Sequence, residues 1–211
     1  MKELSGFTLL PGHLSPDEQA GLIMEILDAA REAPFHAQST PGGKPMSVET
    51  TGMGPLSWVT DRRGYRYEPR HPLTDRAWPP IPPRLKALWS ELADAEVPAD
   101  AALINLYRNG ARMGLHRDED EADFRFPVLS VSLGDTALFR IGGLSRRDPT
   151  RSVRLASGDV CLLAGEARLA YHGVDRILPG SSRLVPGGGR INITLRRAAP
   201  APELARTGRA G

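Results

Sequence analysis

Apolar residues recur at helical spacing in two segments of the first half of the chain. Ser15 can cap a helix that begins at Pro16, and Glu18 completes a capping box. This helix is expected to end near Pro34, and one of its faces carries Leu22, Ile23, Ile26 and Leu27. The same spacing predicts a second helix over residues 83–92, with one face formed by Leu85, Leu88, Trp89 and Leu92.

From residue 102 onward the pattern changes to short apolar runs separated by Gly, Asn, Asp and Ser. These runs predict strands at residues 103–107, 128–133, 137–141, 152–155, 160–163 and 190–195. Many short strands at regular spacing indicate a sandwich or barrel. Between the helices, the turn-rich stretch 39–83 predicts only short strands, around 57–60 and 66–67.

Length and composition limit the class of protein. The 211 residues fit one domain, which we place at residues 1–197, followed by a tail over 198–211 that is predicted to be disordered. No apolar run is long enough to cross a bilayer, and the N-terminus lacks the pattern of an export signal. Cys161, the sole cysteine, lies in an apolar run, so we expect a core residue in a cytoplasmic protein. The net charge of +2 does not by itself indicate a nucleic-acid partner.

Two histidines and an aspartate are candidate metal ligands. His116 and Asp118 would project from the same face of a strand, and His172 follows 54 positions after Asp118. Two imidazoles and one carboxylate leave coordination positions open, as in non-haem iron oxygenases, although zinc hydrolases also use such ligands. A His-x-Asp pair alone is more often a surface pair. Three other histidines lack such partners and are expected on the surface or in loops: His13, His36 and His71.

The segment Arg190–Arg196 alternates polar and apolar residues. Period two puts Arg190, Asn192, Thr194 and Arg196 on one face of a strand. An outer strand with a solvated face would look the same, but a metal site that uses a dicarboxylate co-substrate needs arginine donors. Asn105 and Tyr107, two apart on another strand, could add neutral donors. Because a strand of this length spans roughly 20 Å, both arginines could reach one small diacid only by side-chain reach or a bulge.

These motifs, in this order and spacing, resemble the AlkB-type dioxygenases, and most of all the bacterial DNA-repair members of that family. The resemblance covers residues 35–196, and its most specific part is the Arg-x-Asn-x-Thr-x-Arg strand. It implies a double-stranded β-helix, or jelly-roll, core at about 102–197 in an α+β protein with flanking N-terminal helices. It also implies that His116, Asp118 and His172 bind Fe(II). The implied 2-oxoglutarate site consists of Asn105, Leu106, Tyr107, Arg190, Asn192, Thr194 and Arg196, with O2 as the other co-substrate.

The resemblance further implies a nucleotide-recognition lid at about residues 35–83. Substrate contacts would come from Trp58, Tyr65, Arg66, Tyr67, Asp120 and Arg146. The residues themselves agree, because arginines can neutralise phosphates and aromatic rings can stack on an unpaired base. A solvated hairpin with its aromatic residues packed inward is the alternative. A carboxylate such as Asp120 would favour a base that carries a positive charge after alkylation.

The expected activity is oxidative removal of alkyl groups from bases such as 1-methyladenine and 3-methylcytosine in DNA, releasing formaldehyde and succinate. The target base would be single-stranded or flipped out of a duplex, and we expect a monomer. Alternatives remain at this point: an oxygenase acting on RNA, a protein or a small molecule, or an inactive barrel that binds single-stranded nucleic acid. A zinc hydrolase ranks last, because it would leave the paired arginines of 190–196 unexplained.

Overall fold

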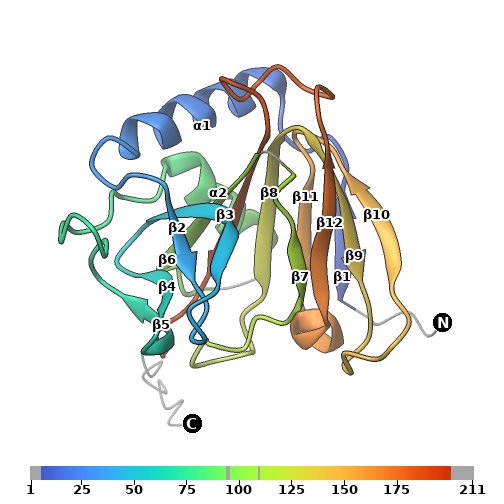
Figure 1. Ribbon diagram of the computed structural model, residues 1–211. Coiled ribbons are helices and arrows are strands. Elements are labelled where there is room, and N and C mark those ends of the chain that lie inside the picture. Colours follow the sequence, from blue (N-terminus) through green and yellow to red (C-terminus); the bar gives the residue numbers. More distant parts are fainter. Residues whose placement is uncertain (1–5, 94–95, 109, 201–211) are drawn as a thin grey trace, which may run out of the picture.

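Both predicted helices are present in the computed structural model, which describes residues 6–93, 96–108 and 110–200 (Figure 1). Helix α1 spans Pro16–Ala29, and its capping box is formed by Ser15 and Glu18, each accepting a hydrogen bond from the other's backbone N–H. Helix α2 spans Pro83–Leu92. The apolar face predicted for each helix is buried except at Leu27, which is exposed, and at Leu92, which is partly buried. Neither of these described helices is long and apolar enough to cross a membrane.

The strands form two antiparallel sheets and a separate hairpin (Figure 1). The major sheet has the order β1 (Phe7–Leu10), β11 (Val160–Leu163), β8 (Val128–Gly134), β13 (Arg190–Arg196), β6 (Ala101–Tyr107), β3 (Pro45–Met53) and β2 (His36–Ser39). The minor sheet has the order β10 (Arg151–Leu155), β9 (Thr136–Ile141), β12 (His172–Leu178) and β7 (Met113–His116). The hairpin consists of β4 (Ser57–Asp61) and β5 (Gly64–Glu68), and a short 3-10 helix, η1 (Gly165–Leu169), precedes β12.

Apolar side chains fill the space on both faces of the major sheet. One cluster joins α1 and α2 to its outer face and includes Ile26, Leu88 and Ile193. The other lies between the two sheets and includes Val128 and Phe139. Helices, major sheet and minor sheet therefore stack as three layers (Figure 1), which confirms the predicted α+β class with a jelly-roll core and flanking N-terminal helices.

The region between the helices is more regular than its sequence pattern predicts. Strand β3 has nine residues and pairs with β2 on one edge and β6 on the other. Its sequence lacks a clean alternation, so it becomes a strand because its neighbours supply hydrogen bonds on both edges. Strands β1, β2 and β12 are likewise not predicted by the pattern, and β7 ends at His116, before Asp118. Among the described strands, only β4 and β5 stand outside the two sheets. The lid at 35–83 stays a prediction.

The end of the described chain is attached to the fold. The Asp100 carboxylate accepts hydrogen bonds from the backbone N–H groups of Ala198 and Ala199, at 2.6 and 3.0 Å. The remainder of the tail for which disorder is predicted, residues 201–211, lies outside the described residues. His71 lies in a loop, as expected, but it is fully buried against Trp78 and His36.

Candidate active site

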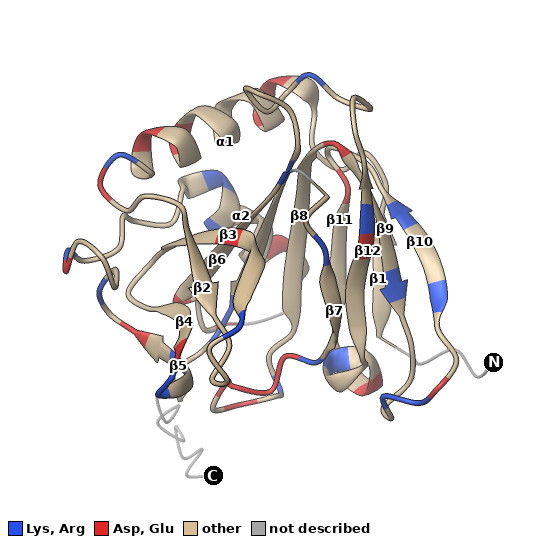
Figure 2. Ribbon diagram, in the orientation of Figure 1, with Lys and Arg blue, Asp and Glu red and all other residues tan. Residues whose placement is uncertain are grey.

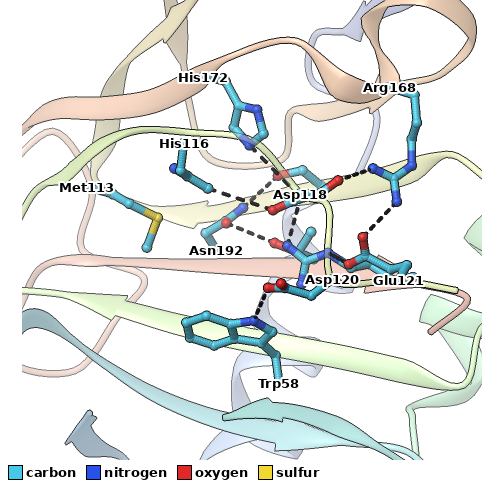
Figure 3. Close-up of polar contacts among 12 residues, drawn as sticks. Trp58, Met113, His116, Asp118, Asp120, Glu121, Arg168, His172 and Asn192 are labelled. Carbon is cyan, nitrogen blue, oxygen red and sulfur yellow. Dashed lines mark hydrogen bonds and ion pairs between the residues drawn. The ribbon is translucent and has the colours of Figure 1, made fainter. Parts of the chain in front are cut away.

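Three candidate metal ligands come together between the sheets (Figure 3). His116 ends β7 and His172 begins β12, and the two strands pair at these residues. Asp118 lies in the loop after β7, so the strand geometry expected to align it with His116 does not apply. Its carboxylate nevertheless lies 3.8 Å from His116 Nε2 and 3.9 Å from His172 Nε2. One donor atom from each residue lies within 4.8 Å of the others, which is close enough for a single ion.

Backbone carbonyls select the nitrogen that each imidazole presents. His116 Nδ1 lies 3.0 Å from the Gly114 carbonyl oxygen, and His172 Nδ1 lies 2.9 Å from that of Ala170. Because a carbonyl only accepts, each Nδ1 carries the proton and each Nε2 keeps its lone pair. Burial and the neighbouring His116 lower the pKa of His172 to about 4, so its ring is neutral near pH 7. Two imidazoles held by backbone carbonyls in this way, with Nε2 of each turned toward Asp118, are suited to metal binding.

Arg196 controls the charge of Asp118. One of its terminal nitrogens donates to Asp118 Oδ2 at 2.8 Å, and both side chains are buried. Burial alone would raise the pKa of Asp118, but Arg196 and the two imidazoles outweigh it and hold that pKa well below its usual range. Asp118 is therefore ionised and available as an anionic ligand.

A cavity of about 330 Å³ opens beside these residues. It is lined from both sheets, from the loop after β7 and from the β4–β5 hairpin. Its apolar wall includes Leu103, Val128, Phe139, Leu155 and Leu163. Cys161 also lines it, and burial raises the pKa of this thiol to about 11, which agrees with the expected core role and not with a nucleophile.

Arg190 forms the cationic end of the cavity. Its side chain is only 1% exposed, yet its Nε and one terminal nitrogen have no hydrogen-bond partner in the described residues. Burial lowers the pKa of Arg190. Nearby, within the part of the chain that the structure describes, the Tyr107 hydroxyl donates to the thioether of Met113, at 3.8 Å, and Asn105 Oδ1 is without a partner. A buried guanidinium without an acceptor is costly, so the arrangement fits an anionic ligand such as a carboxylate.

The other predicted co-substrate residues occupy different places. Asn192 and Thr194 line the cavity but already bond within the protein: Asn192 donates to Ser130 Oγ and accepts from Thr194 Oγ1. Leu106 is not brought to the cavity. It packs in the cluster beneath the helices, because successive residues of β6 face opposite sides of the major sheet. Strand β13 pairs without a bulge, so Arg190 and Arg196 do not converge on one point.

The predicted substrate residues divide into two groups. Trp58, Tyr65, Asp120 and Arg146 line the cavity. Trp58 stacks on Tyr65 with ring centroids 5.5 Å apart, and its indole N–H donates to Asp120 Oδ2 at 2.7 Å (Figure 3). Burial, offset in part by this hydrogen bond, raises the pKa of Asp120.

Two residues of the hairpin lie outside the cavity. Arg66 forms ion pairs with Asp61 and Glu68 along the hairpin itself. Tyr67 donates its hydroxyl hydrogen to Glu121, and burial raises its pKa. Neither residue lines the cavity. The structure therefore brings Trp58 and Tyr65 to the mouth and leaves Arg66 and Tyr67 to hold the hairpin.

Sequence reasoning missed two buried charged residues beside the metal ligands. Arg168, on η1, donates to the backbone carbonyl of Asp118 at 2.7 Å and to Glu121 Oε2 at 2.9 Å (Figure 3). Glu121 also pairs with Arg196 at 3.2 Å. In sequence, Glu121 is one of several acids in a loop, and Arg168 follows no strand or motif pattern, so only the folded chain reveals their burial.

The sequence profile described as the 2OG-Fe(II) oxygenase superfamily matches residues 6–196. The chain belongs to this superfamily. Its similarity to individual members extends over most of its length. It is 65% identical over 193 residues to the alpha-ketoglutarate-dependent dioxygenase AlkB homolog of Caulobacter vibrioides, which covers 92% of this chain and 88% of that protein.

Two further comparisons place it within the superfamily. It is 44% identical over 181 residues to the alpha-ketoglutarate-dependent dioxygenase AlkB of Escherichia coli K12, covering 84% of this chain and 83% of that protein. The solved structure of OsALKBH1 superposes with a TM-score of 0.82 at 27% identity, covering 93% of this chain and 99% of that structure. This 2OG-Fe(II) oxygenase is therefore of the AlkB type, as the motifs predicted.

Members of this superfamily use Fe(II), 2-oxoglutarate and O2, and the site fits the first two. The two imidazoles and one carboxylate match the ligand set of Fe(II), and Arg190, which has nitrogens without a partner among the described residues, matches a buried carboxylate. A zinc hydrolase or an inactive binding module would have no use for Arg190 in this state. Neither alternative is favoured.

Proposed function

We propose that this chain removes alkyl groups from nucleic-acid bases by oxidation, with 1-methyladenine and 3-methylcytosine in DNA as substrates. One observation carries the proposal: a single cavity combines the His116, Asp118 and His172 cluster with the unpartnered Arg190 and with an aromatic mouth. The AlkB proteins of the comparisons support the reaction type, since their names describe dioxygenases that depend on alpha-ketoglutarate.

In this proposal the three clustered side chains bind Fe(II). The carbonyls of Gly114 and Ala170 keep both imidazoles in the ligating tautomer, and Arg196 keeps Asp118 anionic. When bound, the iron and its co-substrates supply the oxidation of the alkyl carbon, with 2-oxoglutarate leaving as succinate and CO2. The hydroxylated alkyl group then leaves the base as formaldehyde.

The co-substrate would occupy the side of the cavity formed by β6 and β13. Arg190 would bind its distal carboxylate as a fork, with the Tyr107 hydroxyl turning from Met113 to the same group. Asn105 and Arg196 lie along the same two strands, nearer the iron ligands in our proposal. Asn192 and Thr194 would form the polar wall. Burial of these groups excludes water, which strengthens every charged contact.

The base would enter between the hairpin and the loop after β7. Trp58 and Tyr65 offer aromatic faces for stacking, and Asp120 offers a carboxylate to a cationic alkylated base. Arg146, on the opposite rim, would meet the phosphate backbone. A base can reach this depth only after leaving the stack, so single strands or flipped bases are the proposed partners. We also propose a monomer in the cytoplasm, and size-exclusion chromatography would test the oligomeric state.

A direct assay tests the function. Anaerobically purified protein would be mixed with Fe(II), 2-oxoglutarate and an oligonucleotide carrying 1-methyladenine, and then exposed to air. We expect equal amounts of succinate and formaldehyde and loss of the methyl group. His116→Ala should give none of these products. If the wild-type protein forms no succinate and leaves the methyl group in place, the proposed function is wrong.

The aromatic mouth needs its own test. Trp58→Ala and Tyr65→Ala should each raise the KM for the oligonucleotide about tenfold, because stacking contributes roughly 1–3 kcal/mol per base. The KM for 2-oxoglutarate should not change in either variant. Arg63→Ala serves as the matched control, since Arg63 is an exposed arginine of the same hairpin that does not line the cavity. Unchanged oligonucleotide kinetics in both aromatic variants would remove base stacking from the proposal.

A further inference from the structure

A second charged feature lies outside the cavity, on the outer face of the minor sheet. On β9, Phe139 and Ile141 face the core, so Leu138 and Arg140 face outward. Arg154 of β10 and Arg176 of β12 are both paired with Leu138 and are exposed. Figure 2 shows blue segments on these three neighbouring strands. Among the described residues, α1 and α2 pack against the major sheet, and neither helix covers this face.

The strand register sets the spacing of these cations. Arg154, Leu138 and Arg176 form one row across three strands, which places the two arginine Cα atoms about 10 Å apart. Arg140 lies two residues further along β9, about 7 Å from that row. It is paired with Ser152 on one side and Gly173 on the other, both of which are small. Its guanidinium donates to the neutral Thr150 hydroxyl, at 3.0 and 3.3 Å, and the side chain stays partly exposed.

A β-bulge is responsible for the position of Arg176. The pairing of β12 with β9 shifts between Val174 and Arg176. In a regular strand Asp175 would face outward and Arg176 would turn back toward the core. The extra residue leaves both exposed, and Ile177 then returns to the core. Bulges commonly re-aim a side chain in this way, and this one adds a cation to the outer face.

Little within the protein neutralises the three arginines. In the described part of the chain, Arg154 and Arg176 have no ion-pair partner. Arg140 lies 3.9 Å from Asp175, and both side chains are about two-fifths exposed, at 41% and 43%. An exposed pair at that distance contributes little. The outer face therefore keeps a net positive charge that is available to a partner.

This face is continuous with the cavity mouth. Arg140 adjoins Ile141, which pairs with the candidate iron ligand His172. The connection from β9 to β10 then carries Arg146, which lines the cavity. The hairpin β4–β5 contributes Trp58 and Tyr65 to the lining of the same cavity. A strand with one base in the cavity would thus leave the mouth past the hairpin in one direction and past Arg146 in the other.

We propose that Arg140, Arg154 and Arg176 form a phosphate-binding track for the nucleic-acid strand on the Arg146 side of the target base. This inference rests on the proposed function. The chemistry is that of backbone phosphates, which are recognised by spaced, exposed cations without regard to sequence. The track would engage nucleotides beyond those in the mouth, so it should matter only for substrates long enough to reach it.

Substrate length provides the test. The double variant Arg154→Ser/Arg176→Ser would be compared with wild type on a trinucleotide and on a 15-nucleotide single strand, each with a central 1-methyladenine. We expect unchanged kinetics on the trinucleotide and a KM about tenfold higher on the 15-mer. The dependence of log affinity on log salt should become shallower by about 1.4, or about 0.7 for each phosphate that an arginine no longer neutralises. Two further oligonucleotides would be extended from the methylated base on only the 5′ or only the 3′ side. The double variant should have a higher KM than wild type for one of them and an unchanged KM for the other.

The control is the double variant Arg31→Ser/Lys86→Ser, which removes two exposed cations from the helical side of the molecule. It should behave as wild type on both substrates. Equal losses on the trinucleotide and the 15-mer, or no change on either, would overturn the track. Fluorescence anisotropy with a fluorescently labelled 15-mer that carries no methylated base measures binding to the track without turnover. A wild-type protein that binds this probe through Arg154 and Arg176 but never demethylates would separate failure of the proposed function from failure of the track.

Discussion

The two ends of β13 present the same residue type in opposite states. Arg190 and Arg196 lie on the same face of one strand, line the same cavity and are both buried. Arg196 is bound by Asp118 and Glu121, at 2.8 and 3.2 Å. Burial would lower the pKa of Arg196, but these carboxylates raise it overall. Arg190 has two nitrogens without a partner among the described residues, and burial lowers its pKa.

This difference distinguishes an arginine with a structural role from one that is available to bind a ligand. A buried ion pair is expensive to break, because removing one partner leaves the other charged and desolvated. A buried charge without a partner costs stability as long as it stays alone, so its retention points to a ligand that completes it. Arg196 therefore belongs to the protein's own structure, and Arg190 belongs to the binding of the co-substrate.

The largest effect is expected when the Arg196 end of β13 loses the carboxylate of Asp118. Asp118→Ala removes one proposed iron ligand and leaves Arg196 with only Glu121, so turnover should fall at least about a thousandfold, since even loss of an outer-sphere partner costs 10–100-fold. Succinate release under saturating Fe(II) measures this. Asp123→Ala, which removes a carboxylate paired with Arg125 in the same loop, should retain wild-type turnover. Substantial activity in Asp118→Ala would reject the ligand assignment.

The next effect is on stability. Arg196→Met leaves the carboxylates of Asp118 and Glu121 buried without their shared cation, so the free energy of unfolding should fall by about 3–5 kcal/mol. Urea unfolding of the metal-free protein at pH 7 gives the value. Part of this loss should be recovered at low pH, because Asp118, whose pKa Arg196 no longer lowers in the variant, can then be protonated. A loss below about 1 kcal/mol would mean that Arg196 is not a structural counter-ion.

The matched variant at the other end should behave in the opposite way. Arg190→Met removes an unpartnered buried charge, so the metal-free protein should be as stable as wild type or more stable. The KM for 2-oxoglutarate should nevertheless rise about a hundredfold, because the variant cannot form the buried, charge-assisted pair with the co-substrate. Unfolding and steady-state kinetics on the same preparation test both statements. A marked loss of stability without a change in KM would mean that Arg190, like Arg196, is a structural residue and does not bind the co-substrate.

The smallest effect is expected from a change in Glu121, the second carboxylate that pairs with Arg196. Glu121→Gln keeps the shape of the side chain but removes the charge shared by Arg168 and Arg196. The free energy of unfolding should fall by about 2 kcal/mol, and turnover by no more than about tenfold. If Glu121→Gln were as damaging as Arg196→Met, Glu121 rather than Asp118 would be the main partner of Arg196.

Local patterns were informative wherever a residue's role depended on its immediate neighbours. The capping box at Ser15 and the apolar spacing of both helices predicted α1 and α2, and turn residues marked six strands. The alternation in 190–196 predicted which side chains share a face, but not that this face is interior. Strand β3, which depends on hydrogen bonds to its neighbouring strands, was not predicted by the pattern of apolar and polar residues.

The sequence by itself determined the chemical inventory of this protein: two imidazoles, a carboxylate and an alternating arginine strand, in an order that identified the family. Only the tertiary structure decided how those groups are charged and which of them have a hydrogen-bond or ion-pair partner within the protein. It buried Arg168 and Glu121 beside Asp118, turned Leu106 away from the cavity, and left Arg190 unpartnered among the described residues. The physical reason is that burial and pairing depend on segments distant in sequence, and desolvation together with pairing sets the state of a charge.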